Sequence, residues 1–281
     1  MKQSFKLLSI IILLISCGKI YDLDIPEKEP ELVVESFISA QKGVKVYLTS
    51  TYPVGTKFKD FSSYGISNAR ILLYNSNNIK VDSLIESQNG KYSSSSPIVL
   101  DITESYRLEI SHDNYPTATT AWVDIPKPFK KIDTTYQIFN DTIVVDLSLT
   151  HSNEDMSDFS FGFDLGANPL NFKYLPTSNP NIENCQTTRF SYKNLSVYNK
   201  DCFIGNVVEF QERTISNGNS DEILYFIGLI SPEARIYYRS INNQPSEFEQ
   251  IVSSPIITKG NIINGEGVFY AIYEYELNIK L

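Results

Sequence analysis

The chain of 281 residues has a net charge of −9, because 33 acidic residues outnumber 24 lysines and arginines. An acidic surface repels nucleic acid and anionic lipid, which excludes binding to either through general surface charge. The length exceeds that of a usual single domain and favours two domains, although one large β-structure also fits it.

Residues 1–16 have the layout of a secretory signal peptide. Lys2 and Lys6 flank the start of an apolar run, which is uncharged from Leu7 to Ile15. The run is too short for a membrane-spanning helix, which needs about 20 apolar residues. Its last residues, LISC, end at Cys17 in an order that resembles the lipobox of bacterial lipoproteins. The resemblance implies cleavage before Cys17 and acylation of its side chain; the alternative is an ordinary signal peptide that happens to contain a cysteine.

A lipidated Cys17 would anchor the mature chain to a membrane. The several acyl chains that a lipobox implies hold a protein stably, whereas one chain at about 0.8 kcal/mol per buried methylene holds it only marginally. Residues 17–30 then form a polar tether that contains two prolines. Without residues 1–16 the chain keeps 22 basic and 33 acidic residues, which gives a net charge of −11.

From Glu31 the sequence changes to short runs rich in Val, Ile, Tyr and Thr, which predict β-strands. Val44, Val46 and Leu48 indicate one buried strand face, and the same alternation recurs from Tyr106 to Ile110. The turn-forming clusters NSNN, SQNG and SHDN separate the runs at a spacing typical of a sandwich. We therefore expect an immunoglobulin-like β-sandwich over residues 31–126, with Trp122 in its core.

The proline pair in IPKP marks a joint, after which residues 129–281 predict a second β-rich domain. Its strand-like runs are TIVVDLSLT, FSFGFDL, VVEF and EILYFIGLI. One short helix is expected after Ser231, a suitable N-cap, with Pro232 at the first helical position and Glu233 in the first turn. The predicted fold class is mainly β with one short helix.

Four stretches together resemble one known family: YDLDIPEKEPELVVESFI, YRLEISHDNYPTATTAWVDIPKP, ISPEARIYYRSINNQ and NIINGEGVFYAIYEYELNIKL. They are similar, in this order and over nearly the whole mature chain, to the Bacteroidota lipoprotein family called domain of unknown function 4249 (DUF4249). Its members are often encoded beside TonB-dependent outer-membrane receptors. The resemblance implies a lipid-anchored outer-membrane protein with an accessory role in uptake and such a receptor as partner. It supplies no catalytic residues.

The sequence lacks the patterns of common catalytic sites, so we expect neither an enzyme nor a cofactor. His112 and His151 are the only histidines, and neither has a second ligand at metal-binding spacing. The chain contains no GxSxG elbow, no HExxH and no glycine-rich phosphate loop. A glycosidase remains open, because its paired carboxylates leave no local signature.

Two long polar connections, residues 52–67 and 166–187, are the candidate binding loops. Aromatic side chains in polar loops suit contacts with protein or sugar. The alternative is that these rings pack each loop onto its own sandwich. The candidate residues are Tyr52, Phe58, Phe61, Tyr64, Phe172 and Tyr174.

Two cysteines remain once Cys17 is lipidated, and an even number in an exported protein predicts a disulfide between Cys185 and Cys202. The chain-entropy account gives about 3 kcal/mol for a loop of this length. The alternative is two free thiols.

Two classes of function fit these features. The first is an accessory binding module beside a TonB-dependent receptor, and the second is a structural cell-surface protein or adhesin without a transport role. The membrane face, periplasmic or cell-surface, stays open. The resemblance links surface display to acidic residues close after the lipidated cysteine, and here Asp22 and Asp24 come only after four non-acidic residues.

Replacing Cys17 by Ser tests the lipid anchor directly. Because the substitution removes the acylation site, we expect the protein to move from the membrane fraction to the soluble fraction. Fractionation followed by immunoblotting measures the change. A Cys17→Ser protein that still sediments with membranes after a high-salt wash would contradict lipid anchoring.

Overall fold

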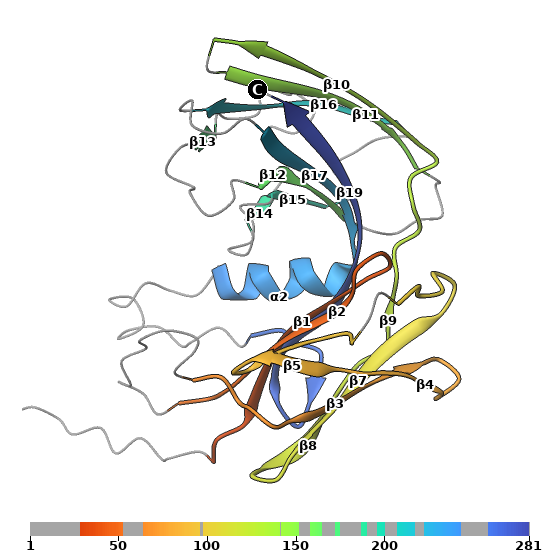
Figure 1. Cartoon of the computed structure of the whole chain (residues 1–281), viewed down its shortest axis with the longest axis vertical. Helices are drawn as coiled ribbons and strands as arrows, with labels where there is room; N and C mark the ends of the chain where they lie inside the picture. The colour runs from red at the N-terminus through yellow and green to blue at the C-terminus, as the bar shows by residue number, and fades with distance from the viewer. Residues whose placement is uncertain are drawn as a thin grey trace, which may run out of the picture. The chain divides into compact units, whose positions relative to one another are not determined.

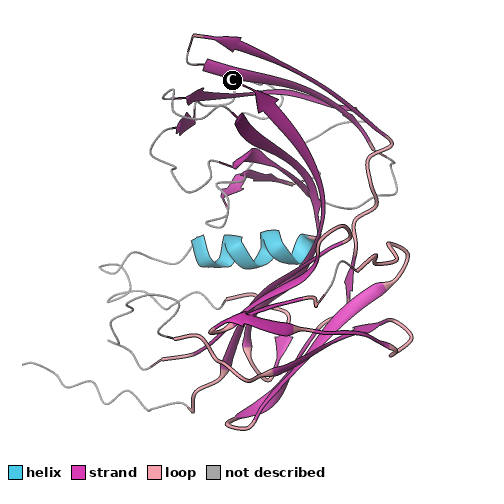
Figure 2. Ribbon diagram, viewed as in Figure 1, coloured by secondary structure: helices cyan, strands magenta, loops and turns pink. Residues whose placement is uncertain are grey.

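The computed structural model describes residues 29–52, 64–95, 98–140, 142–151, 158–164, 172–174, 187–189, 196–199, 207–216, 222–242 and 258–280. Within these ranges the chain is mainly β with one helix, as predicted (Figure 2). No helix in the described ranges is both long and apolar enough to cross a membrane. The described strands form three sheets, named here sheets A, B and C.

Sheet A contains nine strands and draws them from both halves of the chain (Figure 1). Their order across the sheet is β14 (Thr187–Arg189), β15 (Ser196–Tyr198), β12 (Asp158–Asp164), β17 (Glu222–Ile230), β19 (Glu266–Lys280), β1 (Leu32–Ser39), β2 (Gly43–Ser50), β6 (Lys91–Ser93) and β5 (Ile85–Gln88). The domain boundary expected between residues 126 and 129 stays a prediction, and sheet A has strands from both sides of it.

Sheets B and C are smaller, and all their described strand pairs are antiparallel. Sheet B runs β18 (Ile262–Ile263), β8 (Tyr115–Thr120), β7 (Ser105–His112), β3 (Arg70–Asn75) and β4 (Lys80–Ser83), and β9 (Val123–Asp124) also pairs with β7. Sheet C runs β10 (Lys131–Phe139), β11 (Thr142–Thr150), β16 (Val207–Ser216) and β13 (Phe172–Tyr174).

The parallel pair β1 and β19 joins the two halves of sheet A. Its register runs from Val33 opposite Glu266 to Ser39 opposite Ile272. Gly267 has φ of +113°, and a Cβ placed on it would lie 1.9 Å from the carbonyl oxygen of Val34. Only glycine suits such a backbone conformation and such a close approach. The register of this pair therefore depends on Gly267.

Sheets A and B enclose the first core, which confirms a two-sheet sandwich in the N-terminal half. The predicted alternation is observed: Val44, Val46 and Leu48 are buried on β2, and Tyr106, Leu108 and Ile110 are buried on β7. Phe269 and Ala271 of β19 belong to the same core, and β18 extends sheet B. The sandwich thus uses strands from far beyond residues 31–126.

Sheets A and C enclose a second core. Ile143, Val145, Leu147 and Leu149 project from β11 toward Tyr225, Ile227 and Leu229 of β17 and Ile279 of β19, with Phe129 at the margin. Successive side chains of a strand point to opposite faces, so Phe269 and Ile279 lie on one face of β19. That single face of β19 serves both cores.

The helix α2 (Pro232–Asn242) covers the opposite face of sheet A, beside β1 and β19 (Figure 1). It begins directly after Ser231, as predicted. The Ser231 hydroxyl accepts a hydrogen bond from the Ala271 N–H at 3.0 Å, and the Ser231 N–H donates to the Ala271 carbonyl at 2.9 Å. These two bonds fix the start of the helix to β19.

Side chains of α2 then seal this face. Tyr238 donates a hydrogen bond to the Glu35 carboxylate of β1, and Arg235 forms a 2.7 Å ion pair with the buried Asp158 of β12. Burial raises the pKa of Tyr237 to about 12, with the nearby Glu35 and Glu266 charges adding to the effect. Both tyrosines therefore stay neutral at physiological pH and pack as apolar rings with polar tips.

The Gly267→Ala variant tests the β1–β19 contact. A Cβ at this position collides with the Val34 carbonyl and strains the backbone, so we expect the free energy of unfolding to fall by more than about 3 kcal/mol. Urea denaturation followed by circular dichroism measures it, with Glu266→Ala, an exposed neighbour on the same strand, as control. A similar stability for both variants would show that the chain tolerates a shifted register.

Candidate functional site

The structure places two residues of the first candidate loop in contact. The rings of Tyr52 and Tyr64 lie edge to face with centroids 4.6 Å apart, and the Tyr52 hydroxyl donates to the Tyr64 carbonyl at 3.1 Å. This pair closes the two ends of the loop against each other. Phe58 and Phe61 lie outside the described residues. A binding role for this loop stays a prediction.

The second candidate loop contributes Phe172 and Tyr174 to β13, which pairs with β16 at one end of sheet C. The rest of that loop, including Cys185, lies outside the described residues, and so do Cys202 and the lipidation site Cys17. The disulfide and the lipid anchor therefore stay predictions.

Trp122 lies on the outer face of sheet B, and its predicted place in the core is wrong. Its side chain is 41% exposed. Its neighbours Val123 and Ile125 are buried in the first core, so strand alternation directs Trp122 away from that core. The alternation of Trp122 with Val123 and Ile125 could have predicted an exposed Trp122. The prediction instead followed the preference of tryptophan for buried positions.

Trp122, the residue directly before β9, completes a row of three side chains with Tyr74 of β3 and Arg107 of β7. Tyr74 lies opposite Arg107 in the register of β3 and β7. The guanidinium carbon of Arg107 is 5.3 Å from the Tyr74 ring centroid and 5.0 Å from the Trp122 ring centroid. We call this set the Tyr–Arg–Trp row. Sequence reasoning did not identify it, because it combines residues from three separate segments.

The two rings are the main support of the Arg107 side chain. One terminal nitrogen donates to the Asn78 side-chain oxygen at 3.3 Å, while the buried Nε has no hydrogen-bond partner among the described residues. Cation–π contacts contribute about 0.5–1 kcal/mol at exposed sites and up to about 2 kcal/mol when desolvated. The row is therefore held in place before any partner arrives.

The chemistry of the Tyr–Arg–Trp row favours binding over catalysis. Trp, Tyr and Arg are the residue types that dominate the binding energy of protein interfaces. A guanidinium is permanently charged, and an indole only donates a hydrogen bond, so neither acts as a general base. Tyr74 and Arg107 lie on paired strands and Trp122 directly precedes β9, so a partner can contact the row without reordering it.

A hollow of about 350 Å³ lies between sheets A and C, beneath the first half of β10. Its lining residues are Phe129, Lys130, Lys131, Ile132, Thr134, Ile227, Tyr275, Glu276 and Leu277. The Tyr275 hydroxyl accepts a hydrogen bond from the Phe129 N–H at 3.0 Å, and the two rings are 5.7 Å apart. Burial, together with the neighbouring Tyr273, raises the pKa of Tyr275 to about 12. The lining is thus largely apolar, with an uncharged Tyr275 and three charged residues, Lys130, Lys131 and Glu276.

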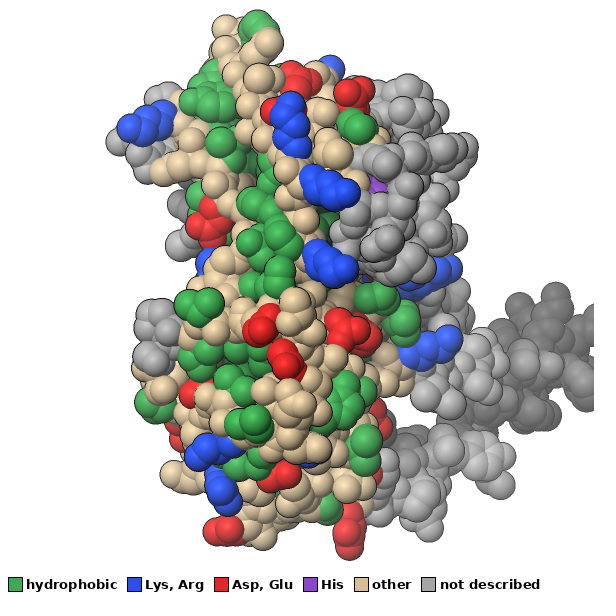
Figure 3. Space-filling model, turned by 90° about the vertical axis from the view of Figure 1, so that its right-hand side faces the viewer, with side chains coloured by type: hydrophobic (Ala, Val, Ile, Leu, Met, Phe, Trp, Pro, Cys, Tyr) green, Lys and Arg blue, Asp and Glu red, His purple; other side chains and the backbone are tan. Residues whose placement is uncertain are grey.

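Figure 3 views the side on which β10 and β11 lie in Figure 1. Hydrophobic side chains gather along the middle of this face, next to several lysine or arginine side chains. Apolar surface that stays exposed between charged residues is a common feature of interaction sites. Apolar and basic side chains therefore lie next to each other on this face.

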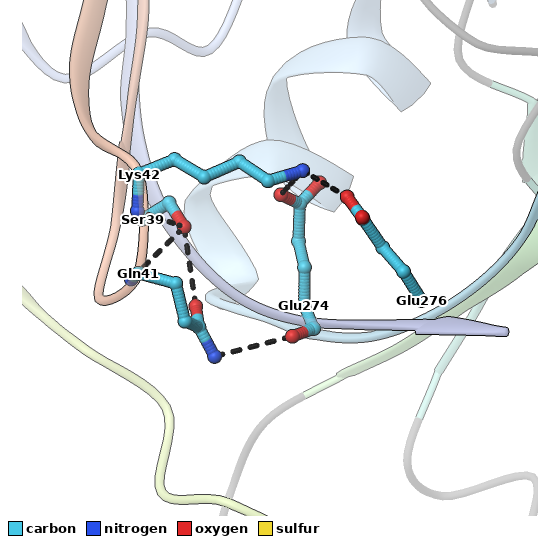
Figure 4. Close-up of polar contacts among 5 residues, drawn as sticks. All are labelled: Ser39, Gln41, Lys42, Glu274 and Glu276. Carbon is cyan, nitrogen blue, oxygen red and sulfur yellow. Dashed lines mark hydrogen bonds and ion pairs between the residues drawn. The ribbon is translucent and has the colours of Figure 1, made fainter.

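A charged cluster fixes the turn between β1 and β2 to β19 (Figure 4). The ammonium of Lys42 contacts the carboxylates of Glu274, at 3.1 Å, and Glu276, and lies 5.4 Å from the Phe226 ring centroid. Gln41 donates from its side chain to the Glu274 carbonyl at 3.1 Å. Burial lowers the pKa of Lys42, but the two glutamates outweigh it, so its pKa is raised overall. Lys42 is a fixed cation rather than a base.

The histidines and acidic residues of the described ranges form no metal-binding group of three or more. His112 ends β7, where its Nδ1 accepts a hydrogen bond from the Asn114 N–H at 3.1 Å and its ring lies beside Tyr115. His112 thus supports the turn between β7 and β8.

The sequence belongs to a known family. Residues 19–277 match the domain of unknown function DUF4249, so the chain is a member of that family, as its four quoted stretches predict. None of the curated proteins compared with it matches. Among solved structures, the Fcho1 mu homology domain of Danio rerio with a bound Eps15 peptide is similar over 90% of this chain and 96% of that chain. The sequence identity is 6% and the TM-score 0.25, a likeness from which we draw nothing.

Trp122→Ala measures how the Tyr–Arg–Trp row contributes to stability. Because Trp122 is partly exposed and mainly contacts Arg107, we expect the free energy of unfolding to fall by about 1 kcal/mol. A buried tryptophan would cost about 3–5 kcal/mol. Urea denaturation followed by circular dichroism distinguishes the two values.

The wild-type protein offers an independent check, since Trp122 is its one tryptophan. We expect its fluorescence to be quenched readily by acrylamide in the folded state. A strongly protected fluorescence together with a large loss of stability would place the ring in a core instead.

Proposed function

We propose that this protein is a lipid-anchored outer-membrane lipoprotein that acts as an accessory interaction module beside a TonB-dependent receptor. The observation that carries the proposal is the Tyr–Arg–Trp row: an exposed tryptophan directly before β9, packed on an arginine that lies beside a half-buried tyrosine on two paired strands. Surfaces of this composition supply the central contacts of many protein interfaces. Membership of the DUF4249 family supports the receptor as partner, because its members are often encoded beside such receptors.

The N-terminal segment supports the proposed location. The lipobox-like order ending at Cys17 suits acylation, and residues 17–30 suit a spacer between the membrane and β1. A flexible chain of that length spans about 20 Å on average, from about 5–6 Å times the square root of the residue number. The folded part could therefore reach the rim of a neighbouring membrane protein while anchored to the same leaflet.

The row suits a standing contact with a protein better than turnover of a substrate. Its Arg107 can pair with a carboxylate or a backbone carbonyl of the partner, and Trp122 can fill an apolar depression there. Both contacts would strengthen as water leaves the interface, because the guanidinium is already held between two rings.

A structural surface protein or adhesin is the alternative function. It would also use an anchored β-sandwich, but it would not require a stable complex with a receptor in the same membrane. The composition of complexes purified from the membrane therefore separates the two functions.

We expect a β-barrel receptor to copurify with the tagged wild-type protein from gently solubilised outer membranes, and the pair to migrate as one larger complex on blue-native gels. Trp122→Ala and Arg107→Ala should each reduce recovery of the receptor by about tenfold or more, as expected for central interface residues. Lys280→Ala, at an exposed residue near the end of β19 in sheet A, should leave recovery unchanged.

Two results would contradict the proposal. One is migration of the wild-type protein as a free monomer under conditions that preserve other receptor complexes. The other is copurification of a receptor that is equally strong in the Trp122→Ala, Arg107→Ala and Lys280→Ala variants, which would place the contact elsewhere.

A further inference from the structure

Strand β10 has a long edge that no other described strand covers. It is the end strand of sheet C and pairs, among the strands that the structure describes, with β11 alone. Its register with β11 runs without a shift from Lys131 opposite Thr150 to Phe139 opposite Thr142. An edge this long and regular, with neither proline nor bulge, is a template for pairing with another strand.

The two ends of β10 differ in how their core-facing side chains are covered. Ile132, Thr134, Tyr136 and Ile138 lie opposite core residues of β11, so they point to the second core. Ile132 and Thr134, near the start, line the hollow, which is lined by no residue of β11. Tyr136 and Ile138, near the end, are each 40% exposed. The first half of β10 thus borders the hollow, and the second half has core-facing side chains that are partly exposed to solvent.

We propose that β10 pairs antiparallel with β10 of a second copy of this chain, about a twofold axis at Thr135, so that two copies of sheet C become one continuous sheet. Antiparallel pairing of a strand with itself produces a closed, symmetric contact. The contact lies on sheet C, away from the strands that carry the Tyr–Arg–Trp row, so this inference does not rest on the proposed function.

The register about Thr135 matches each uncovered side chain with a space for it. Opposite residues of an antiparallel pair point to the same face of the sheet, so core-facing residues must meet core-facing residues. Centred on Thr135, Ile132 meets Ile138 of the second copy, and Thr134 meets its Tyr136. The exposed Tyr136 and Ile138 of each copy thereby enter the hollow of the other, above Ile227 and Leu277.

The neighbouring registers lose this match. A centre at Thr134 would bring Ile138 opposite the exposed Lys130, and a centre at Tyr136 would bring Ile132 opposite Asn140. With the centre at Thr135, the outer face brings Asp133 opposite Gln137 and Lys131 opposite Phe139, so no like charges meet. Lys131 and Asp133 already form an ion pair within each strand. Shape and charge therefore favour the same register.

A cysteine at the twofold axis tests the register in the full chain made soluble by Cys17→Ser. Residues directly opposite each other in an antiparallel pair have α-carbons about 4.5–5.5 Å apart, a distance that a disulfide spans. We expect Thr135→Cys to give a covalent dimer under mild oxidation on a non-reducing gel. Gln137→Cys, which would lie opposite Asp133, and the parent protein, which keeps Cys185 and Cys202, should not.

Charged substitutions test the contact by sedimentation equilibrium. Ile138→Lys places an ammonium opposite Ile132, in a hollow of the second copy that already holds two lysines, so we expect the dissociation constant of the dimer to rise by about tenfold or more. Gln137→Lys adds the same charge one residue closer to the axis, on the outer face and opposite Asp133, and should change the constant by less than about threefold.

Three results would overturn the inference. The first is a wild-type chain that stays monomeric at about 100 µM, a concentration at which even a weak specific dimer would form. That result is expected if β10 pairs with a strand of a different protein. The second is a dimer with equal sensitivity to Ile138→Lys and Gln137→Lys. The third is a Thr135→Cys chain that forms no more covalent dimer than the Gln137→Cys chain.

Discussion

The parallel pairing of β1 with β19 is the contact on which the other layers depend. It brings segments from opposite ends of the sequence into neighbouring positions of sheet A. The Ser36 hydroxyl adds a buried hydrogen bond to the Val268 carbonyl at 3.2 Å. Because one face of β19 supplies Phe269 to the first core and Ile279 to the second, a shift of its register would disturb both cores at once.

The two faces of sheet A are covered by different elements: sheets B and C pack on one face, and the helix α2 packs on the other. The face of sheet B that points away from sheet A carries the Tyr–Arg–Trp row. On the face of sheet A covered by α2, Arg235 reaches Asp158. A buried ion pair of this kind adds little net stability, but losing one partner leaves an uncompensated charge, so it fixes the position of the helix.

The cluster around Lys42 acts in a similar way at the edge of the same sheet. The Glu274 side chain is almost fully buried, and its charge is tolerable because the Lys42 ammonium stays protonated beside it. Lys42 lies in the turn that joins β1 to β2, so the turn and β19 are held together by charge as well as by backbone pairing. The ion pairs of Lys42 and the hydrogen bond of Gln41 therefore fix the position of this turn against β19.

Local patterns in the sequence were reliable where each strand pairs with a neighbour along the chain. The alternation around Val46 and Leu108 and the helix start at Ser231 are all observed, because burial of one face is a property of a single segment. The run from Ile79 to Ile85 instead divides at Leu84 into β4 and β5, which belong to different sheets. Nothing in the order of these seven residues indicates that the chain passes from one sheet to another at Leu84.

Contacts between distant segments could not be read in this way. The pairing of β1 with β19 and the Tyr–Arg–Trp row depend on which strands meet, and a single sequence does not encode that in any spacing. The edge strand β10 was also missed, although Ile132, Thr134, Tyr136 and Ile138 have the period of a strand. Polar residues between them, and the absence of a dense apolar run, masked the pattern.

The β1–β19 pair also determines when the chain can fold. Ser36 and Val268 are 232 residues apart, and closing a loop of that length costs about 5 kcal/mol of chain entropy before any contact repays it. Synthesis proceeds from the N-terminal end, so the edge of β1 that pairs with β19 stays open until β19 has been made. Folding dominated by such distant contacts is slow. The first sandwich of this protein is therefore begun by β1 and β2 but completed only by β19, and neither core is complete before that strand has paired.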